Sequence, residues 1–464
     1  MSMLNMEGQA SQWLNSSIKF YYIWKKITQA LILLYSNHIT ARLSYICNFI
    51  FRDILRVDHQ LTSSAEQFDQ HQGPKINYSQ QDFSGALVIR PKELLFEKEI
   101  TPKEPFVTQW DNVRIFFQTD DQSHIPFDLL AASFYLVSRY EEHLPYHKDE
   151  HGRFEAKQSL AYNNNFLQQP IIDEWAYMLA DLLAEHFPGF RTGERSFKYI
   201  STIDIANAYA FLFKGISRTL GATLRSLLNL NLEDNLRRYQ TLASKRDPYD
   251  TYDIFFDIHQ KYNLKPLWFF LVGDSGRFDD NVSVDKTAYQ NLIRDIAAKF
   301  DVGIHPSYKA FKNYKLLSQE VKKLEGIIDR KVTKSRQHYL KIHFDETYQN
   351  LIQSGIEQDY TMGYATDIGF RAGTCTPFHY YDLQKEEETP LTIYPFQIMD
   401  ITLNQHKGYN ITEAISVVED LIEKIKRVNG TFISIWHNEA LSDHGHWKDW
   451  ETVYREMLRL VFEK

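Results

Sequence analysis

The feature that most constrains this chain is a run of β-forming residues that ends in a carboxylate. Residues 198–205 read Lys-Tyr-Ile-Ser-Thr-Ile-Asp-Ile, so Asp204 lies at the carboxyl end of a predicted strand. Enzymes built on parallel sheets carry catalytic groups at this end of their strands. Three later runs also lead from a predicted strand into polar side chains, namely His305, Arg336 with His338, and His437. If these strands share one parallel sheet, an acid, three histidines and an arginine converge at one edge.

Predicted strands and helices alternate along the C-terminal part of the chain. Runs of apolar residues at helical spacing separate predicted strands at 266–272, 302–304, 360–364, 395–400 and 431–436. Strands separated by helices of these lengths indicate parallel βα units. Another acid, Asp400, ends the strand predicted at 395–400.

The N-terminal part also mixes the two patterns, with a predicted strand at 30–35 and helical spacing at 41–55 and 170–187. We therefore expect a two-domain α/β protein. Residues 1–25 form an extension that need not be ordered, and residues 26–195 form a smaller N-terminal α/β domain. Residues 196–464 form the second domain, with a helical insertion near 215–250.

Composition narrows the classes of partner. A net charge of −8 and a pI near 6.1 provide no basic surface for nucleic acid or for an anionic membrane. Two cysteines far apart exclude a disulfide framework and favour a reducing compartment. The most apolar N-terminal run, residues 30–35, is too short to span a membrane, and no secretory signal is evident. We expect a cytoplasmic protein.

Four motifs in order along the chain resemble those of the polysaccharide deacetylases, the family with the chitooligosaccharide deacetylase homology domain. They are Thr202-Ile203-Asp204, Gly303-Ile304-His305-Pro306-Ser307, Arg336-Gln337-His338 and Ile433-Ser434-Ile435-Trp436-His437. The resemblance implies a distorted (β/α) barrel that hydrolyses N- or O-acetyl groups on a polysaccharide or cell-envelope glycan, using a divalent metal, usually zinc. Residues 138–142 and 173–177 resemble the extra N-terminal domain of a bacterial branch of that family.

The resemblance also implies roles for individual residues. Asp204 matches the family's base, His437 its acid, and His305 the first histidine of its metal-ligand pair. The sequence departs from the pattern at the other ligand positions, where Ile205, Ala206 and Lys309 stand. His338 could supply one missing ligand, and Asp204 could bind the metal rather than act as base. A second possible cluster, His437, His444 and His446 with Asp443, follows the last strand.

The remaining candidates have two interpretations each. Arg336 and Arg371 either orient Asp204 or bind substrate oxygens, or else form structural ion pairs. Asp400 either pairs with His437 and raises its pKa, or caps a turn. Two other functions stay open: a weak or inactive homologue that binds glycan, and a metal-free glycosidase that uses Asp204 and Asp400 as its carboxylates.

Overall fold

The computed structural model describes residues 31–120, 122–214, 241 and 246–463, which divide into two compact units. Unit 1 takes the described residues up to 98, with 105–134 and 173–195. Unit 2 takes residues 99–104, 135–172 and the described residues from 196 onward. The chain thus crosses between the units several times, and residues 135–172 group with the C-terminal part. The extension at 1–25 and most of the helical insertion near 215–250 lie outside the described residues.

Unit 1 is built on a four-stranded parallel sheet in the order β2-β1-β3-β4. The strands are β1 (Ile32–Tyr35), β2 (His59–Thr62), β3 (Lys75–Asn77) and β4 (Leu87–Val88), and a short antiparallel pair, β5 (Thr108–Trp110) and β6 (Val113–Ile115), lies apart from them. The helices are α2 (Ala41–Cys47), continued by the wider turns of Asn48–Ile54, α3 (Ala65–Gln70), the first part of α4 (Leu129–Val137) and most of α6 (Ile171–His186). Thr40 caps α2 by accepting a hydrogen bond from the backbone N–H of Leu43. Unit 1 thus contains both helices and a parallel sheet.

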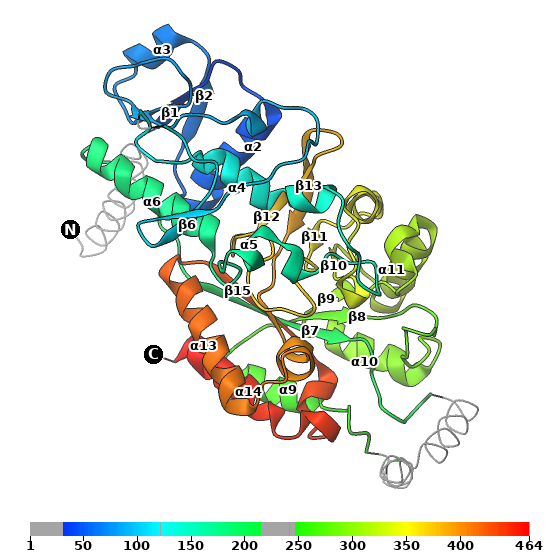
Figure 1. Cartoon of the computed structure of the whole chain (residues 1–464). Coiled ribbons are helices and arrows are strands. Elements are labelled where there is room, and N and C mark those ends of the chain that lie inside the picture. The colour runs from blue at the N-terminus through cyan, green and yellow to red at the C-terminus, as the bar shows by residue number, and fades with distance from the viewer. Residues whose placement is uncertain (1–30, 121, 215–240, 242–245, 464) are drawn as a thin grey trace, which may run out of the picture. The chain divides into compact units, whose positions relative to one another are not determined.

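Unit 2 is built on a nine-stranded sheet in the order β12-β13-β11-β10-β9-β8-β7-β15-β14. The strands are β7 (Lys198–Ile205), β8 (Leu267–Phe270), β9 (Asp301–Ile304), β10 (Lys334–Ser335), β11 (Gln358–Asp359), β12 (Phe378–Asp382), β13 (Glu387–Ile393), β14 (Ile398–Met399) and β15 (Thr431–His437). The helices are α5 (Leu160–Asn163), α9 (Tyr252–Lys261), α10 (Thr287–Ala297), α11 (Tyr314–Ile328), α12 (Gln349–Gln353), α13 (Ile411–Arg427) and α14 (Trp450–Phe462), and Figure 1 shows α9, α10, α11, α13 and α14 lying around the strands.

Every pair in this sheet is parallel except β12 with β13, which form an antiparallel hairpin at one edge. The parallel βα units were predicted, whereas the hairpin was not. The predicted distorted (β/α) barrel is not seen as a closed one, because the two edge strands, β12 and β14, do not pair with each other among the described residues. Two backbone hydrogen bonds join the segment after β11 to the segment before β14, from Phe396 N to Met362 O and from Gly369 N to Gln397 O, both at 3.0 Å.

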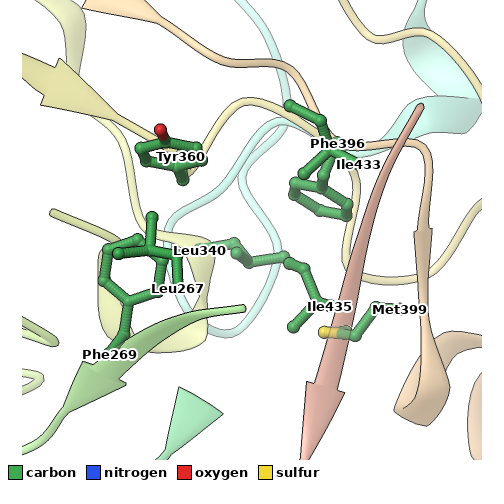
Figure 2. Close-up of a cluster of buried hydrophobic side chains, with 8 residues drawn as sticks. All are labelled: Leu267, Phe269, Leu340, Tyr360, Phe396, Met399, Ile433 and Ile435. Atoms are coloured by element: carbon green, nitrogen blue, oxygen red, sulfur yellow. The ribbon is translucent and has the colours of Figure 1, made fainter. Parts of the chain in front are cut away.

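One face of this sheet carries a buried hydrophobic cluster, shown in Figure 2. Its members are Leu267, Phe269, Leu340, Tyr360, Phe396, Met399, Ile433 and Ile435. Leu267 and Phe269 are two residues apart on β8, as are Ile433 and Ile435 on β15, because alternate strand residues face the same side. Continuing the alternation along β15 puts His437 on the same face at the carboxyl end. The register pairs His437 with Asp204 on β7, so strand geometry alone brings these two side chains together.

Candidate active site

Asp204 is held by a buried arginine from a strand three places away in the sheet. Arg336, which follows β10 and is 0% exposed, donates from Nη1 to Asp204 Oδ1 at 2.9 Å and to Thr202 Oγ1 at 2.7 Å. Its Nε donates to Tyr360 O at 3.0 Å, and its guanidinium lies 4.8 Å from the ring centre of Phe269. Burial lowers the pKa of Arg336, although the Asp204 charge opposes that effect. Arg336 thus forms a buried ion pair that orients Asp204, which fits both of the roles predicted for it.

His437 forms a tight pair with Asp400, which follows β14 and is 0% exposed. His437 donates from Nδ1 to Asp400 Oδ1 at 2.9 Å and from its backbone N–H to Oδ2 at 2.6 Å. Burial alone would lower the pKa of His437, but the charge and hydrogen bond of Asp400, with the charges of Asp204 and Glu439, raise it to about 9. His437 is therefore an imidazolium at neutral pH, able to give up a proton.

His305 is in the opposite state. Its Nδ1 lies 2.7 Å from the carbonyl oxygen of Arg336, which can only accept, so Nδ1 carries the proton. Burial, together with the neighbouring His338 and His437, holds the pKa of His305 well below its usual value, although the hydrogen bond to the Arg336 carbonyl opposes them. The ring is therefore neutral, with a lone pair on Nε2. That atom is buried and has no hydrogen-bond partner among the described residues.

His338 belongs to a second acid–histidine pair that sequence reasoning missed. Its Nδ1 donates to Asp279 Oδ1 at 2.8 Å, and Asp279 is 3% exposed. The ring centres of His338 and His305 lie 4.8 Å apart. Asp279 stands in the irregular segment after β8, where no periodic pattern or strand end marks it. Only the local turn residues Gly273 to Gly276 signalled a loop there.

These side chains border one cavity of about 370 Å³ within unit 2. Its lining includes Asp204, Ala206, His305, His338, His437 and Glu439. Burial raises the pKa of Glu439, and the positive His437 opposes that rise. Asp400 and Arg336 do not line the cavity; each acts from behind on a residue that does.

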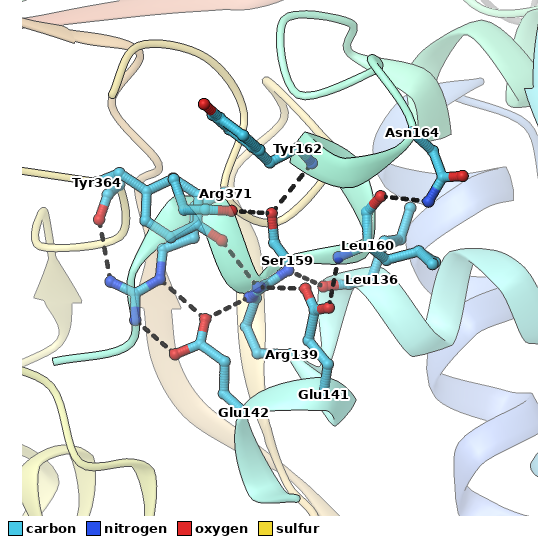
Figure 3. Close-up of polar contacts among 12 residues, drawn as sticks. Leu136, Arg139, Glu141, Glu142, Ser159, Leu160, Tyr162, Asn164, Tyr364 and Arg371 are labelled. Carbon is cyan, nitrogen blue, oxygen red and sulfur yellow. Dashed lines mark hydrogen bonds and ion pairs between the residues drawn. The ribbon is translucent and has the colours of Figure 1, made fainter. Parts of the chain in front are cut away.

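Arg371 lies outside this cavity. It donates from Nη2 and Nε to Glu142 at 2.5 and 2.9 Å and from Nη1 to Gly363 O, as part of the buried network in Figure 3. Arg139 donates to the same carboxylate from Nε at 2.8 Å and to Tyr364 from Nη2 at 3.2 Å. Of the two predicted roles of Arg371, the geometry matches the structural ion pair.

The described residues do not fit a zinc centre with three protein ligands. His305 Nε2 is buried, has a lone pair and has no hydrogen-bond partner among the described residues, and the ring of His338 lies beside that of His305. However, no group of three or more His, Cys, Asp or Glu side chains suited to a metal occurs among the described residues. Ala206 lines the cavity and offers no ligand atom, and Asp204 is committed to Arg336. The loop histidines 444 and 446 form no such group either. The zinc requirement implied by the resemblance stays a prediction.

Cys47 and Cys375 are both buried, and neither forms a disulfide among the described residues. Within the described residues, no helix combines the length and the apolar character that crossing a membrane requires.

Comparison with known proteins gives matches to each part of the chain. A family of unknown function, DUF7033, matches residues 32–188. No curated protein matches. Among solved structures, a "putative polysaccharide deacetylase" from Mycobacterium smegmatis is 13% identical, covers 58% of this chain and 85% of its own, and has a TM-score of 0.39. A polysaccharide deacetylase from Bacillus cereus is 9% identical, with 57% and 86% covered and a TM-score of 0.28. A CE4 family pseudoenzyme from Bacillus anthracis is 12% identical, with 57% and 62% covered and a TM-score of 0.26.

Proposed function

We propose that this chain is a hydrolase that removes acetyl groups from an acetylated glycan. The observation that carries the proposal is the division of states between two histidines of one cavity. His437 is held protonated by Asp400, and His305 is held neutral. A protonated His437 can give a proton to a leaving group, and a neutral His305 in the same cavity can accept a hydrogen bond from a ligand. The four motifs that resemble polysaccharide deacetylases support the choice of an acetyl group as the target.

In the proposed reaction Asp204 acts as the base and His437 as the acid. Asp204 Oδ1 is held by Arg336, and Oδ2 makes no hydrogen bond among the described residues, so it can accept a proton from water. The water oxygen then bonds to the acetyl carbonyl carbon. The bond from that carbon to the sugar nitrogen or oxygen breaks as His437 protonates the leaving atom. The products are acetate and a free sugar amine or hydroxyl. His305 offers its Nε2 lone pair to a hydrogen-bond donor in the cavity.

A second candidate is a homologue that binds glycan without turning it over. The specific observation in its favour is the ligand set, because Ile205 and Ala206 stand where the resemblance expects acidic residues. The metal-free glycosidase loses support. Asp400 is fully buried, receives hydrogen bonds from His437 and from Ile401 N, and does not line the cavity. Without it, Asp204 lacks the partner carboxylate that this alternative named.

The test is acetate release by the purified full chain from acetylated substrates. Suitable substrates are tri-N-acetylchitotriose for an amide and acetylated xylotriose for an ester. We expect release from at least one, lowered about 10²- to 10⁴-fold in Asp204→Asn and in His437→Gln, the usual contribution of a positioned base or acid. Asp420→Asn, on the exposed side of α13, is the matched control. Binding of either trisaccharide without acetate release, with or without added zinc, would favour the glycan-binding candidate.

A further inference from the structure

Three aromatic rings gather beside the cavity from three successive loops of unit 2. Phe278 follows β8, Tyr308 follows β9 and Tyr339 follows β10. Phe278 and Tyr308 are stacked, with ring centres 4.2 Å apart and planes at 29°. Tyr339 meets both edge-on, at 5.6 Å from Phe278 and 5.2 Å from Tyr308. Phe278 and Tyr339 line the cavity that contains Asp204 and His437. We call these three rings the aromatic platform.

Asp279 ties the three loops together. Its Oδ1 accepts a hydrogen bond from Tyr308 N at 2.9 Å and one from His338 Nδ1 at 2.8 Å. Asp279 is itself the residue after Phe278, and His338 is the residue before Tyr339. One buried carboxylate oxygen therefore links the backbone positions from which all three rings project. The platform is held by specific bonds and is more than a chance meeting of surface rings.

The backbone under Tyr339 is strained. Tyr339 and Leu340 have φ values of 59° and 55°, in the left-handed region that bulky side chains rarely adopt. Arg153, itself paired with Asp149, donates from Nη1 to Tyr339 O at 2.8 Å and so helps to hold this conformation. Non-glycine residues in such conformations gather at ligand sites, where the surroundings maintain them for function.

Tyr308 is also supported by a cation. The Lys341 ammonium lies 3.6 Å from the ring centre of Tyr308 and 3.9 Å from that of Phe311. Lys341 is 6% exposed and forms no salt bridge within the part of the chain that the structure describes. The Lys341 ammonium therefore lies against two aromatic rings. This arrangement fixes Tyr308 in place behind Phe278.

A buried amide side chain of the same cavity has no hydrogen-bond partner among the described residues. Gln337, immediately before His338, is 1% exposed and is among the lining residues. Neither its amide oxygen nor its amide nitrogen has a hydrogen-bond partner among the described residues. Buried amides are normally satisfied, so this one points to a ligand that both donates and accepts hydrogen bonds. Sugar hydroxyls do both.

We propose that the aromatic platform, with Gln337 beside it, binds a pyranose ring of the glycan next to the sugar that carries the acetyl group. The apolar C–H face of a pyranose packs on aromatic rings, and its hydroxyls reach polar groups at the ring edge. The preferred substrate is then an oligosaccharide rather than a single acetylated sugar. This rests on the proposed function for the nature of the ligand, but binding itself requires no turnover.

The test is calorimetric titration of the full chain carrying Asp204→Asn, which keeps any substrate intact, with tri-N-acetylchitotriose, acetylated xylotriose and N-acetylglucosamine. Tyr339→Asn removes a ring while keeping a residue that tolerates the left-handed backbone, and Phe278→Leu removes the other lining ring. Tyr314→Asn, at an exposed tyrosine of α11, is the matched control.

We expect at least one trisaccharide to bind more tightly than N-acetylglucosamine, and each platform variant to raise its Kd at least tenfold while the control does not. Unchanged Kd values in both folded platform variants overturn the proposal, as does absence of trisaccharide binding by the parent chain. The same measurement separates this proposal from the proposed function. Platform-dependent binding with no acetate release by the wild-type chain sustains the platform and refutes the hydrolase.

Discussion

Replacing Asp400 with asparagine tests the protonation state on which the proposed chemistry depends. Asp400 is the main reason that the pKa of His437 rises to about 9 in spite of burial. A pKa of about 9 rather than the usual 6.5 corresponds to about 3 kcal/mol of preference for the protonated ring. Asparagine keeps the size and one acceptor oxygen but removes the charge. We expect the pKa of His437 in Asp400→Asn to fall to about 6.5 or below.

The expected effect on rate follows from the protonated fraction. At pH 8, a pKa of about 9 leaves about 90% of His437 protonated, and a pKa of about 6.5 leaves about 3%, a roughly thirtyfold difference in available acid. The pH dependence of acetate release should therefore lose its alkaline plateau in the variant. Nuclear magnetic resonance of histidine-labelled protein, with His437→Gln to assign the signal, measures the pKa directly. Asp420→Asn serves again as the control.

The free energy of unfolding should also fall as His437 loses its proton at alkaline pH. Because folding raises the pKa of His437, its contribution to stability is complete below the unfolded value near 6.5 and is lost as the pH rises through about 9. Urea unfolding should show the wild-type chain losing up to about 3 kcal/mol over this window relative to Asp400→Asn. A His437 pKa that stays above 8 in the variant, or parallel stability curves for the two proteins, would refute the reasoning.

Three further predictions concern single positions. Glu142→Gln removes the charge that two buried arginines share, and should cost about 3–5 kcal/mol of unfolding free energy in urea; a loss below 1 kcal/mol would contradict it. Burial lowers the pKa of Lys341 to about 8, so the free energy of unfolding of the wild-type chain should fall as the pH falls from 10.5 through 8. Lys341→Met removes this effect, so it should raise the urea midpoint at pH 7 but not at pH 11. Ala206→Asp adds an oxygen ligand to the cavity that His305 also lines, and it should tighten zinc binding at least tenfold by calorimetry, with Ala206→Asn as control. Equal affinities of the two variants would place any metal elsewhere.

The site residues at the strand ends could be predicted from the sequence, because the alternation along a strand and the place where the strand ends together locate them. Alternation predicts which side each residue of a strand faces, and a polar residue after a buried run marks the carboxyl end. Asp204, His305, Arg336 and His437 all follow this rule, and the structure brings them to one region of unit 2. The pairing of Asp400 with His437 was one of two predicted interpretations, and the hydrogen bonds at 2.9 and 2.6 Å select it.

Contacts between segments far apart in the sequence could not be predicted in this way. Arg371 finds Glu142 across 229 residues of sequence, and nothing local to either residue predicts that meeting. Residues 135–172, which carry Glu142, group with the C-terminal part of the chain, and no local pattern in the sequence predicts that grouping. The β12–β13 hairpin was not predicted, because the expected pattern has helices between the strands and these two strands are joined directly.

The loops show where the limit lies, and they also decide what the site can do. Asp279 has no periodic signal, yet it orients His338 and links the segments that carry Phe278, Tyr308 and Tyr339. Loop residues contact the core through individual hydrogen bonds, which leave no repeating pattern in the sequence. The partner of a given loop residue is therefore visible only in the structure. The strand ends provide Asp204 and His437, which the motifs made recognisable, whereas the loops provide Phe278 and Tyr339, which line the same cavity. A chain that keeps Asp204 and His437 but has Ala206 in place of a ligand can therefore retain glycan recognition whether or not it retains turnover, which is why binding and acetate release must be measured separately.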